Sequence, residues 1–382
     1  MNFDRLKNFL DNELLSYGIP GSDTVIYHGR EEVFRHTTGY DSLTDKTPMN
    51  PNALYNLYSC TKVATAVAAT QLIERAEIVA TDPIYAYFPE FKDVRVAVKD
   101  ESGRIVDTRP VKNHITIQHL LTMTSGLNYN LDVPAIKRFK EETNGKCPTV
   151  KFPSYLATEP LDFEPGERWS YSLSLDVIGS LIELVSGTSL GEYMKKNIFE
   201  PIGMKNTSFG FTEDKVKRLA TQYNYDAEKG MAVEIPRDFN RYVFGTEYES
   251  GGAGLISCLD DQILFVDTLT HLGLAKNGNR ILSERGVNLI RSDALSPEVY
   301  PTFNMSHSRG YSYGYGVRIN KTPSLYGNLS PVGEFGWDGA KMSYISCDPE
   351  NKISMFHAEH MGALHAIVWP RLRNLLYSSF DY

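Results

Sequence analysis

Cysteine is scarce in this chain of 382 residues, and no two cysteines form a CxxC pair. The four are Cys60, Cys147, Cys258 and Cys347. Their scatter argues against a zinc site and against a dithiol redox motif. His357 and His360 are close enough in sequence to suggest a metal site, but their segment, KISMFHAEH, has the pattern of a strand, where residues three apart point to opposite faces. The sequence therefore predicts no metal site.

Runs of like charge and long apolar runs are also absent. The formal net charge is −8 and no Lys/Arg cluster is present, which argues against nucleic acid or an anionic membrane as a partner. No apolar run is long enough to span a bilayer. The first twenty residues mix charged and apolar side chains and lack the apolar core and cleavage site of a signal peptide. We therefore expect a cytoplasmic protein with no membrane span, and nothing in the sequence indicates its oligomeric state.

What is present is the composition of a folded protein. Hydrophobic residues make up 42% of the chain, charged residues 23% and aromatic residues 12%. A chain of this length is more than one average domain usually holds. We therefore expect either one large unit with two lobes or two domains.

Apolar spacing and turn residues predict the order of the elements. The N-terminal half should contain a helix over 3–17, a hairpin that turns at His28-Gly29-Arg30, a helix over 58–76, a hairpin that turns at Glu101-Ser102-Gly103, and a helix ending at Gly126. The second half should contain a helix closed by Gly187, a helix ended by Pro201, three strands in YSYGYGVRI, AKMSYISCD and NKISMFHAEH, and a last helix over 363–378.

This order predicts an α/β (α+β) fold with a central antiparallel β-sheet that both ends of the chain build. Residues 1–79 and 250–382 should form the sheet domain with its flanking helices. Residues 80–249 should form an inserted, mainly helical lobe. A site is expected in the cleft between the two parts.

The segment LYSCTKVATA carries the first candidate for chemistry. Ser59 and Lys62 are three residues apart on a predicted helix, so they share a face and the amine can reach the hydroxyl. This is the arrangement of a nucleophile and its base. The pattern S-x-x-K is short, and a chain of this length is expected to contain about one by chance.

A structural interpretation of the same residues is that Ser59 caps the helix and Lys62 lies on the surface. However, a cation in the first turn faces the positive end of the helix dipole, and the following residues are small and apolar. Lys62 is therefore expected to be buried, where burial and the dipole both disfavour the ammonium form. The same helix end offers backbone N–H groups to an oxyanion.

Further segments follow SCTK in a fixed order: HLLTMTSGL, FEPGERWSYSLSLDVIGSLIELVSG, SGGAGLIS and GEFGWDGAKMSYISCDPEN. With them the sequence resembles the class C β-lactamase-like serine hydrolases over roughly residues 19–360. This family includes β-lactamases, penicillin-binding D-alanyl-D-alanine carboxypeptidases and family VIII esterases. The resemblance implies a β-lactamase/transpeptidase-like fold and no cofactor.

The resemblance also assigns site residues. The family's Tyr-x-Asn tyrosine matches Tyr171, which is implied to share proton transfer with Lys62; which of the two is the base stays open. The family's Lys-Thr-Gly or His-x-Gly triplet matches Trp337-Asp338-Gly339, whose glycine suits close approach of a ligand. The N–H groups of Ser59 and Ala340 are implied to form the oxyanion hole.

Two departures from the family pattern bear on the substrate. Leu173 stands where an asparagine helps to hold β-lactam amides, and Trp337-Asp338 replaces a basic or polar pair that meets the substrate carboxylate. An acid there should repel an anionic substrate. The tryptophan is similar to that of family VIII esterases. Aromatic residues near the motifs are further candidates for the substrate pocket: Tyr129, Tyr242, Phe244 and Tyr313.

The leading hypothesis is an enzyme, a serine hydrolase that forms an acyl-enzyme on Ser59 and acts on a small-molecule ester or amide, with esters favoured. One alternative is a β-lactamase or D-Ala-D-Ala carboxypeptidase, and another is an acyltransferase. A catalytically silent relative that binds a ligand in the same cleft is the alternative from another class.

Overall fold

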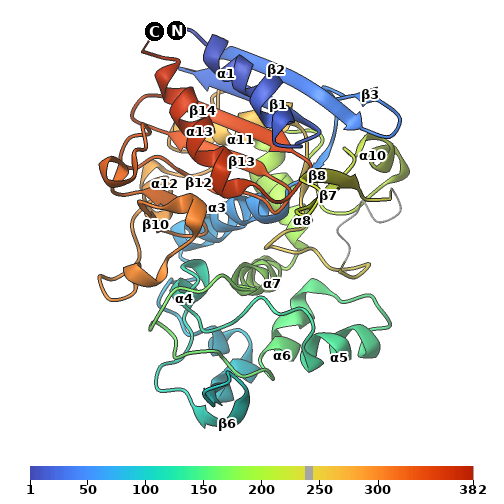
Figure 1. Ribbon diagram of the computed structural model, residues 1–382. Coiled ribbons are helices and arrows are strands. Elements are labelled where there is room, and N and C mark those ends of the chain that lie inside the picture. The colour runs from blue at the N-terminus through green and yellow to red at the C-terminus, as the bar shows by residue number, and fades with distance from the viewer. Residues whose placement is uncertain (237–243, 382) are drawn as a thin grey trace.

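A computed structural model describes residues 1–236 and 244–381 of the chain. Its central feature is an antiparallel sheet to which both chain ends contribute, with strand order β10-β11-β12-β13-β14-β1-β2-β3 (Figure 1). The strands are β1 (Gly21–His28), β2 (Glu31–Ser42), β3 (Thr47–Pro48), β10 (Tyr311–Tyr313), β11 (Arg318–Asn320), β12 (Phe335–Gly336), β13 (Ser343–Asp348) and β14 (Ile353–Glu359). The predicted fold class is confirmed.

The middle strands of this sheet are buried on both faces. Val25 and Ile26 are neighbours in β1 and point to opposite sides, because successive side chains alternate along a strand. Val25 belongs to the core that contains α11 (Leu259–Thr270), which contacts β1, β13 and β14. Ile26 belongs to the core beneath α1 (Asp4–Asn8) and α13 (His365–Ser378), which cross the opposite face in Figure 1.

The rest of the described chain is mainly helical. Its helices are α2 (Leu14–Ser16), α3 (Thr61–Glu74), α4 (Ile117–Leu121), α5 (Pro134–Glu142), α6 (Phe152–Leu156), α7 (Ser174–Ser186), α8 (Leu190–Met194), α9 (Glu200–Ile202), α10 (Glu213–Arg218) and α12 (Glu284–Ile290). Short strand pairs join β4 (Tyr55–Asn56) to β9 (Ile256–Ser257), β5 (Arg95–Lys99) to β6 (Ile105–Pro110), and β7 (Tyr223–Asp226) to β8 (Met231–Glu234).

Two predicted helix ends were wrong. Helix α4 ends at Leu121, before Gly126, which has φ +86° and lies where a Cβ would be 2.3 Å from the carbonyl oxygen of Phe163. Gly126 therefore allows two loops to pass closely. Pro201 lies within α9, and the helix ends one residue later, at Ile202, with Gly203 in the left-handed conformation as its C-cap. The helix closed by Gly187 is confirmed.

The β7–β8 hairpin lies within residues 80–249, the range predicted for the helical lobe. Tyr223 and Ala232 pack in the same core as Ile26 and Trp369, beneath α13. This hairpin therefore packs with the sheet and not with the helices of the inserted segment.

The two histidines considered for a metal have separate, buried partners. The His357 ring contacts Thr24 Oγ1 at 2.8 Å and Glu359 Oε1 at 2.9 Å, whereas His360 Nδ1 lies 2.7 Å from the carbonyl oxygen of Thr221. Within residues 1–236 and 244–381, no three His, Cys, Asp or Glu side chains are grouped to hold a metal ion. No helix of that same part of the chain is both long and apolar enough to cross a membrane.

Asp23 in β1 makes the stability of the fold depend on pH. Burial raises the pKa of its carboxyl to about 6, although a hydrogen bond from Thr37 and the charges of Arg35 and His357 act in the opposite direction. Between about pH 4 and 6 the unfolded chain has lost this proton and the folded chain retains it, so stability falls as pH rises. Above pH 6 the fold carries a poorly solvated carboxylate.

Asp23→Asn should therefore raise the free energy of unfolding at pH 8 by about 2 kcal/mol and flatten its fall between pH 4 and 6. Urea titrations at pH 4.5, 6 and 8 measure both effects. Asp45→Asn, at an exposed position, is the matched control and should change neither. An Asp23→Asn variant less stable than the wild type at pH 8 would contradict the assignment.

Candidate active site

Ser59 lies in a 3-10 turn, Tyr58–Cys60, directly before α3. The preceding residue, Tyr58, has φ +46°, so the chain turns sharply into the helix. Ser59 makes no side-chain capping hydrogen bond, and its side chain is almost buried. The capping interpretation of Ser59 is therefore wrong.

Lys62 is fully buried, as expected from the small apolar residues that follow it. Its Nζ donates to Ser59 Oγ at 3.2 Å and to the carbonyl oxygen of Gly252 at 2.7 Å. The same Nζ lies 4.6 Å from the centre of the Tyr171 ring. The interpretation of Lys62 as a surface residue is wrong, because its side chain is buried and its Nζ is directed at the Ser59 hydroxyl.

The glycine-rich turn SGGAG brings that carbonyl to Lys62. A Cβ on Gly252 would lie 2.3 Å from Asp176 Oδ2, and a Cβ on Gly251 would lie 2.4 Å from the carbonyl oxygen of Leu175. Thr65 on α3 donates to the Gly251 carbonyl at 2.7 Å. Glycine is needed at both positions because the turn fits between α3 and the start of α7.

Asp176, in the first turn of α7, is a site residue that sequence reasoning missed. Its Oδ1 accepts from Ser250 Oγ at 2.6 Å and from Tyr248 OH at 3.0 Å. Burial raises the pKa of its carboxyl, while the nearby charge of Lys62 acts against this shift. Asp176 therefore holds the turn that supplies the carbonyl partner of Lys62. Its position in the segment SLSLDVIG, close after Tyr171, was the available signal.

Tyr171 comes from the loop before α7, and its hydroxyl donates to Ser59 Oγ at 2.5 Å. The ring makes stacked contacts with two others: Tyr129 at 5.3 Å and 8°, and Trp337 at 5.9 Å and 19°. Tyr313 meets the Trp337 ring edge-on at 5.1 Å. The predicted residues Tyr129, Tyr171, Tyr313 and Trp337 are therefore brought together as one aromatic wall beside Ser59, in which Tyr129 and Tyr171 are partly exposed and Tyr313 and Trp337 are buried.

The segment Trp337 to Ala340 is held against the turn that carries Ser59. Ser343 Oγ donates to the carbonyl oxygen of Leu57 at 2.9 Å, and a Cβ on Gly339 would lie 2.4 Å from that same oxygen. The sequence interpretation attributed this glycine to the approach of a ligand. The structure gives a different reason, since a Cβ there would meet both Ser343 Oγ and the backbone that precedes Ser59.

Ala340 follows at an exposed position, and within residues 1–236 and 244–381 its N–H has no hydrogen-bond acceptor. Cys60, next to Ser59, is not a competing nucleophile, because burial raises the pKa of its thiol to about 12. The Ser59 hydroxyl, and not the Cys60 thiol, is therefore the candidate nucleophile of this turn.

Asp338 differs from expectation. Its carboxylate is buried on the opposite side of the strand from Trp337, where Oδ2 lies 3.3 Å from Trp369 Nε1 and 3.3 Å from His307 Nε2. Burial alone would raise the pKa of this carboxyl, but the contact with His307 and the charges of His307 and His365 lower it to about 2. The expected repulsion of anionic substrates by Asp338 gains no support from this geometry, because the carboxylate faces Trp369 and His307 and not Ser59.

The other pocket candidates have mixed outcomes. Leu173 is buried at the start of α7 and presents no amide to the site. Phe244 packs against Phe152 and Tyr248 in the helical part, not against the aromatic wall. Tyr242 lies outside the described residues.

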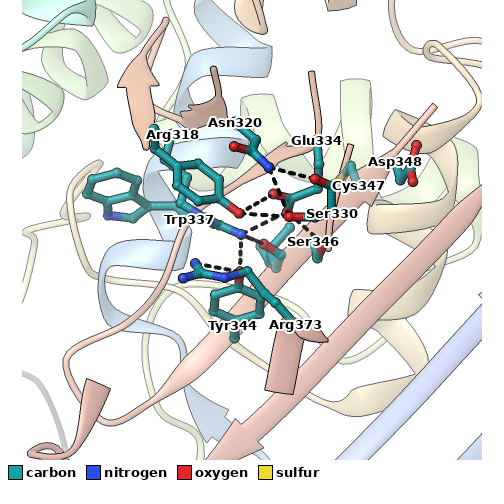
Figure 2. Close-up of polar contacts among 12 residues, drawn as sticks. Arg318, Asn320, Ser330, Glu334, Trp337, Tyr344, Ser346, Cys347, Asp348 and Arg373 are labelled. Carbon is teal, nitrogen blue, oxygen red and sulfur yellow. Dashed lines mark hydrogen bonds and ion pairs between the residues drawn. The ribbon is translucent and has the colours of Figure 1, made fainter. Parts of the chain in front are cut away.

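A buried ion pair supports the strand that leads to Trp337. Arg318 and Glu334 are both fully buried and lie 2.9 Å apart. Figure 2 draws this pair with its polar partners. Glu334 also accepts from Tyr311 OH at 2.8 Å and from Ser346 Oγ at 2.7 Å. Arg373 stacks over the Tyr311 ring, 4.9 Å from its centre. This network joins β10, β11, β13 and α13 behind β12.

Sequence comparison relates this chain to known proteins. The Beta-lactamase family model matches residues 4–358. The Esterase EstB of Burkholderia gladioli is 26% identical over 363 residues, which cover 88% of this chain and 84% of that protein.

Two solved structures have the same fold. "EstCE1, a hydrolase with promiscuous acyltransferase activity" superposes with a TM-score of 0.79 at 24% identity and covers 98% of each chain. The unliganded Simvastatin Synthase (LovD) from Aspergillus terreus superposes with a TM-score of 0.82 at 21% identity, covering 100% of this chain and 99% of that one. Because the family model spans nearly the whole sequence, this chain belongs to the Beta-lactamase family, as its motifs SCTK to WDGA suggested.

Proposed function

We propose that this chain is a serine hydrolase that forms an acyl-enzyme on Ser59 and hydrolyses carboxylic esters. The observation that carries the proposal is the convergence on Ser59 Oγ of the Tyr171 hydroxyl at 2.5 Å and Lys62 Nζ at 3.2 Å. A buried amine and a phenol beside one hydroxyl are suited to remove its proton and to return it later.

The reaction begins when Ser59 Oγ attacks the ester carbonyl and its proton passes to the Lys62–Tyr171 pair. The N–H groups of Ser59 and Ala340 stabilise the oxyanion that develops on the carbonyl oxygen. The intermediate then collapses, the C–O bond to the alcohol breaks, and the alcohol leaves with the proton from the pair. A water molecule attacks the acyl-enzyme in the same way, giving its proton to the pair, and the acid leaves as Ser59 recovers its hydrogen.

The side chains around Ser59 favour a neutral acyl group. The amine of Lys62 contacts Ser59, Tyr171 and Gly252. Trp337 stands where the family triplet has a basic residue, and its ring stacks on Tyr171. The partly exposed rings of Tyr129 and Tyr171 offer an apolar surface, backed by contact with the buried Trp337, and buried Leu173 supplies no amide for a β-lactam. The relative EstB is an esterase, which supports the same assignment.

The test is to incubate the protein with an aryl butyrate and, separately, with a fluorophosphonate probe. We expect turnover of the ester and a covalent adduct on Ser59, and loss of both in Ser59→Ala. A chromogenic cephalosporin in parallel should open at least about 10²-fold more slowly, since the site lacks groups that hold its amide and carboxylate. No turnover and no adduct would end the proposal and leave the silent relative.

Two alternatives predict different outcomes of that test. Faster opening of the cephalosporin than of the ester would indicate a β-lactamase or carboxypeptidase. Faster transfer of the butyryl group to an added alcohol than to water would indicate an acyltransferase. The structural neighbour EstCE1, a hydrolase with promiscuous acyltransferase activity, makes this second comparison worth including.

A further inference from the structure

The peptide group between Gly339 and Ala340 is held from one side. Its carbonyl oxygen accepts from the Met342 N–H at 2.9 Å and lies 3.2 Å from His365 Nε2. The N–H of this same peptide group is that of Ala340, the donor assigned to the oxyanion. What orients the Gly339 carbonyl therefore also orients the Ala340 N–H, because the six atoms of a peptide group lie in one plane.

His365 is itself fixed by its surroundings. It is the first residue of α13, and its ring lies edge-on to Trp369, one turn later, with centres 5.8 Å apart. Its Nε2 is 3.9 Å from Asp338 Oδ2, the oxygen that Trp369 Nε1 and His307 also face. Because Nε2 faces a carbonyl oxygen and a carboxylate, it is the ring nitrogen that carries hydrogen and donates. Asp338 thus anchors the ring behind the strand.

We propose that His365 is a positioning residue that fixes and polarises the Gly339–Ala340 peptide, so that the Ala340 N–H points at the oxyanion. The proposal rests on the proposed function. An amide that accepts hydrogen bonds at its oxygen becomes a better donor at its nitrogen. A donor that is already oriented also costs no reorganisation when the negative charge develops. His365 contacts neither Ser59 nor Lys62 through any interaction found in the described chain, and acts through the peptide group alone.

The experiment compares His365→Ala, His365→Asn and His365→Gln with the wild type. Butyrate hydrolysis gives kcat and KM, and the Ki of n-butylboronic acid reports a tetrahedral adduct on Ser59 that needs the oxyanion hole. For His365→Ala we expect kcat to fall about tenfold, KM to change less than about twofold, and Ki to rise about tenfold. These effects should be smaller than the loss of about 10²–10³-fold in kcat that follows removal of a whole oxyanion-hole donor.

Glutamine places its amide nitrogen about as far from the backbone as histidine Nε2, and asparagine does not. His365→Gln should therefore recover most of kcat and Ki, while His365→Asn should behave like His365→Ala. The Gln and Asn pair also keeps the test decisive if the alanine variant does not fold. His114→Ala, at an exposed histidine, is the matched control and should leave all three constants unchanged.

Failure of this inference and failure of the proposed function look different. Suppose that the wild type hydrolyses butyrate and that kcat and Ki of all three His365 variants equal those of the wild type. The role of His365 is then overturned and the hydrolase stands. Equal losses in His365→Gln and His365→Asn would also overturn it, since they indicate a packing role. If the wild type neither turns over the ester nor forms the Ser59 adduct, both are overturned.

Discussion

Replacing Lys62 by methionine should lower kcat/KM for an aryl butyrate at least about 10³-fold. Methionine keeps the unbranched apolar stem of the buried lysine and is one atom shorter, so the change removes the amine that donates to Ser59 Oγ at 3.2 Å and leaves most of the stem's volume filled. The carbonyl oxygen of Gly252 loses its 2.7 Å partner, which should cost about 1–3 kcal/mol of stability. Steady-state hydrolysis, the rate of fluorophosphonate labelling and a urea titration measure these effects.

Lys196→Met is the control for this prediction, because it makes the same substitution at an exposed lysine. It should change neither hydrolysis nor labelling. If Lys62→Met remained folded and kept both, the proposed mechanism would be wrong even for an active hydrolase.

Glu334→Gln should lower the free energy of unfolding by about 3–5 kcal/mol. The change is nearly isosteric, but it removes the carboxylate that faces the Arg318 guanidinium. Arg318 then remains buried over the Tyr344 ring, and Arg373 over the Tyr311 ring, without that negative charge. Removing one partner of a buried pair leaves an uncompensated charge where water cannot reach it. Urea titration of the wild type and the variant measures the difference.

A surface pair of the same length provides the comparison. Lys146 and Glu247 also lie 2.9 Å apart, but their side chains are 62% and 49% exposed. Glu247→Gln should cost less than about 1 kcal/mol. Equal effects of the two substitutions would show that burial does not govern the strength of the Arg318–Glu334 pair.

The sequence was most informative where the structure depends on near neighbours. Ser59 and Lys62 are one helical turn apart, so their contact follows from helix geometry once the run of small residues predicts a helix. The β1–β2 hairpin and the αL residue Gly187 are local in the same sense. Tyr171 needed the family resemblance, because 112 residues separate it from Ser59 and no local rule joins them.

Two kinds of contact could not be predicted from the sequence. One depends on which face of a strand a side chain occupies, and the other is made by the last helix. Whether Asp338 or Trp337 faces Tyr171 depends on the register of β12 against its neighbours, and a slip of one residue would exchange the two. His365 is separated from Gly339 by 26 positions and lies at a helix start with no motif around it. Phe244 was wrongly associated with the site on sequence proximity of aromatics, whereas its actual partners are Phe152 and Tyr248.

The pairing of β1 with β14 has a consequence for how the chain folds. Thr24 contacts His357 across 333 positions, so this part of the sheet cannot close until the segment around His357 has left the ribosome. On the ribosome, Ser59 and Lys62 emerge long before Trp337 to Ala340. On the proposed function, we therefore expect the nascent chain to carry Ser59 without the Ala340 N–H and to gain activity only when β13 and β14 have joined β1. Until then the unpaired edge of β1 is open to other strands, which makes late synthesis the stage most exposed to aggregation.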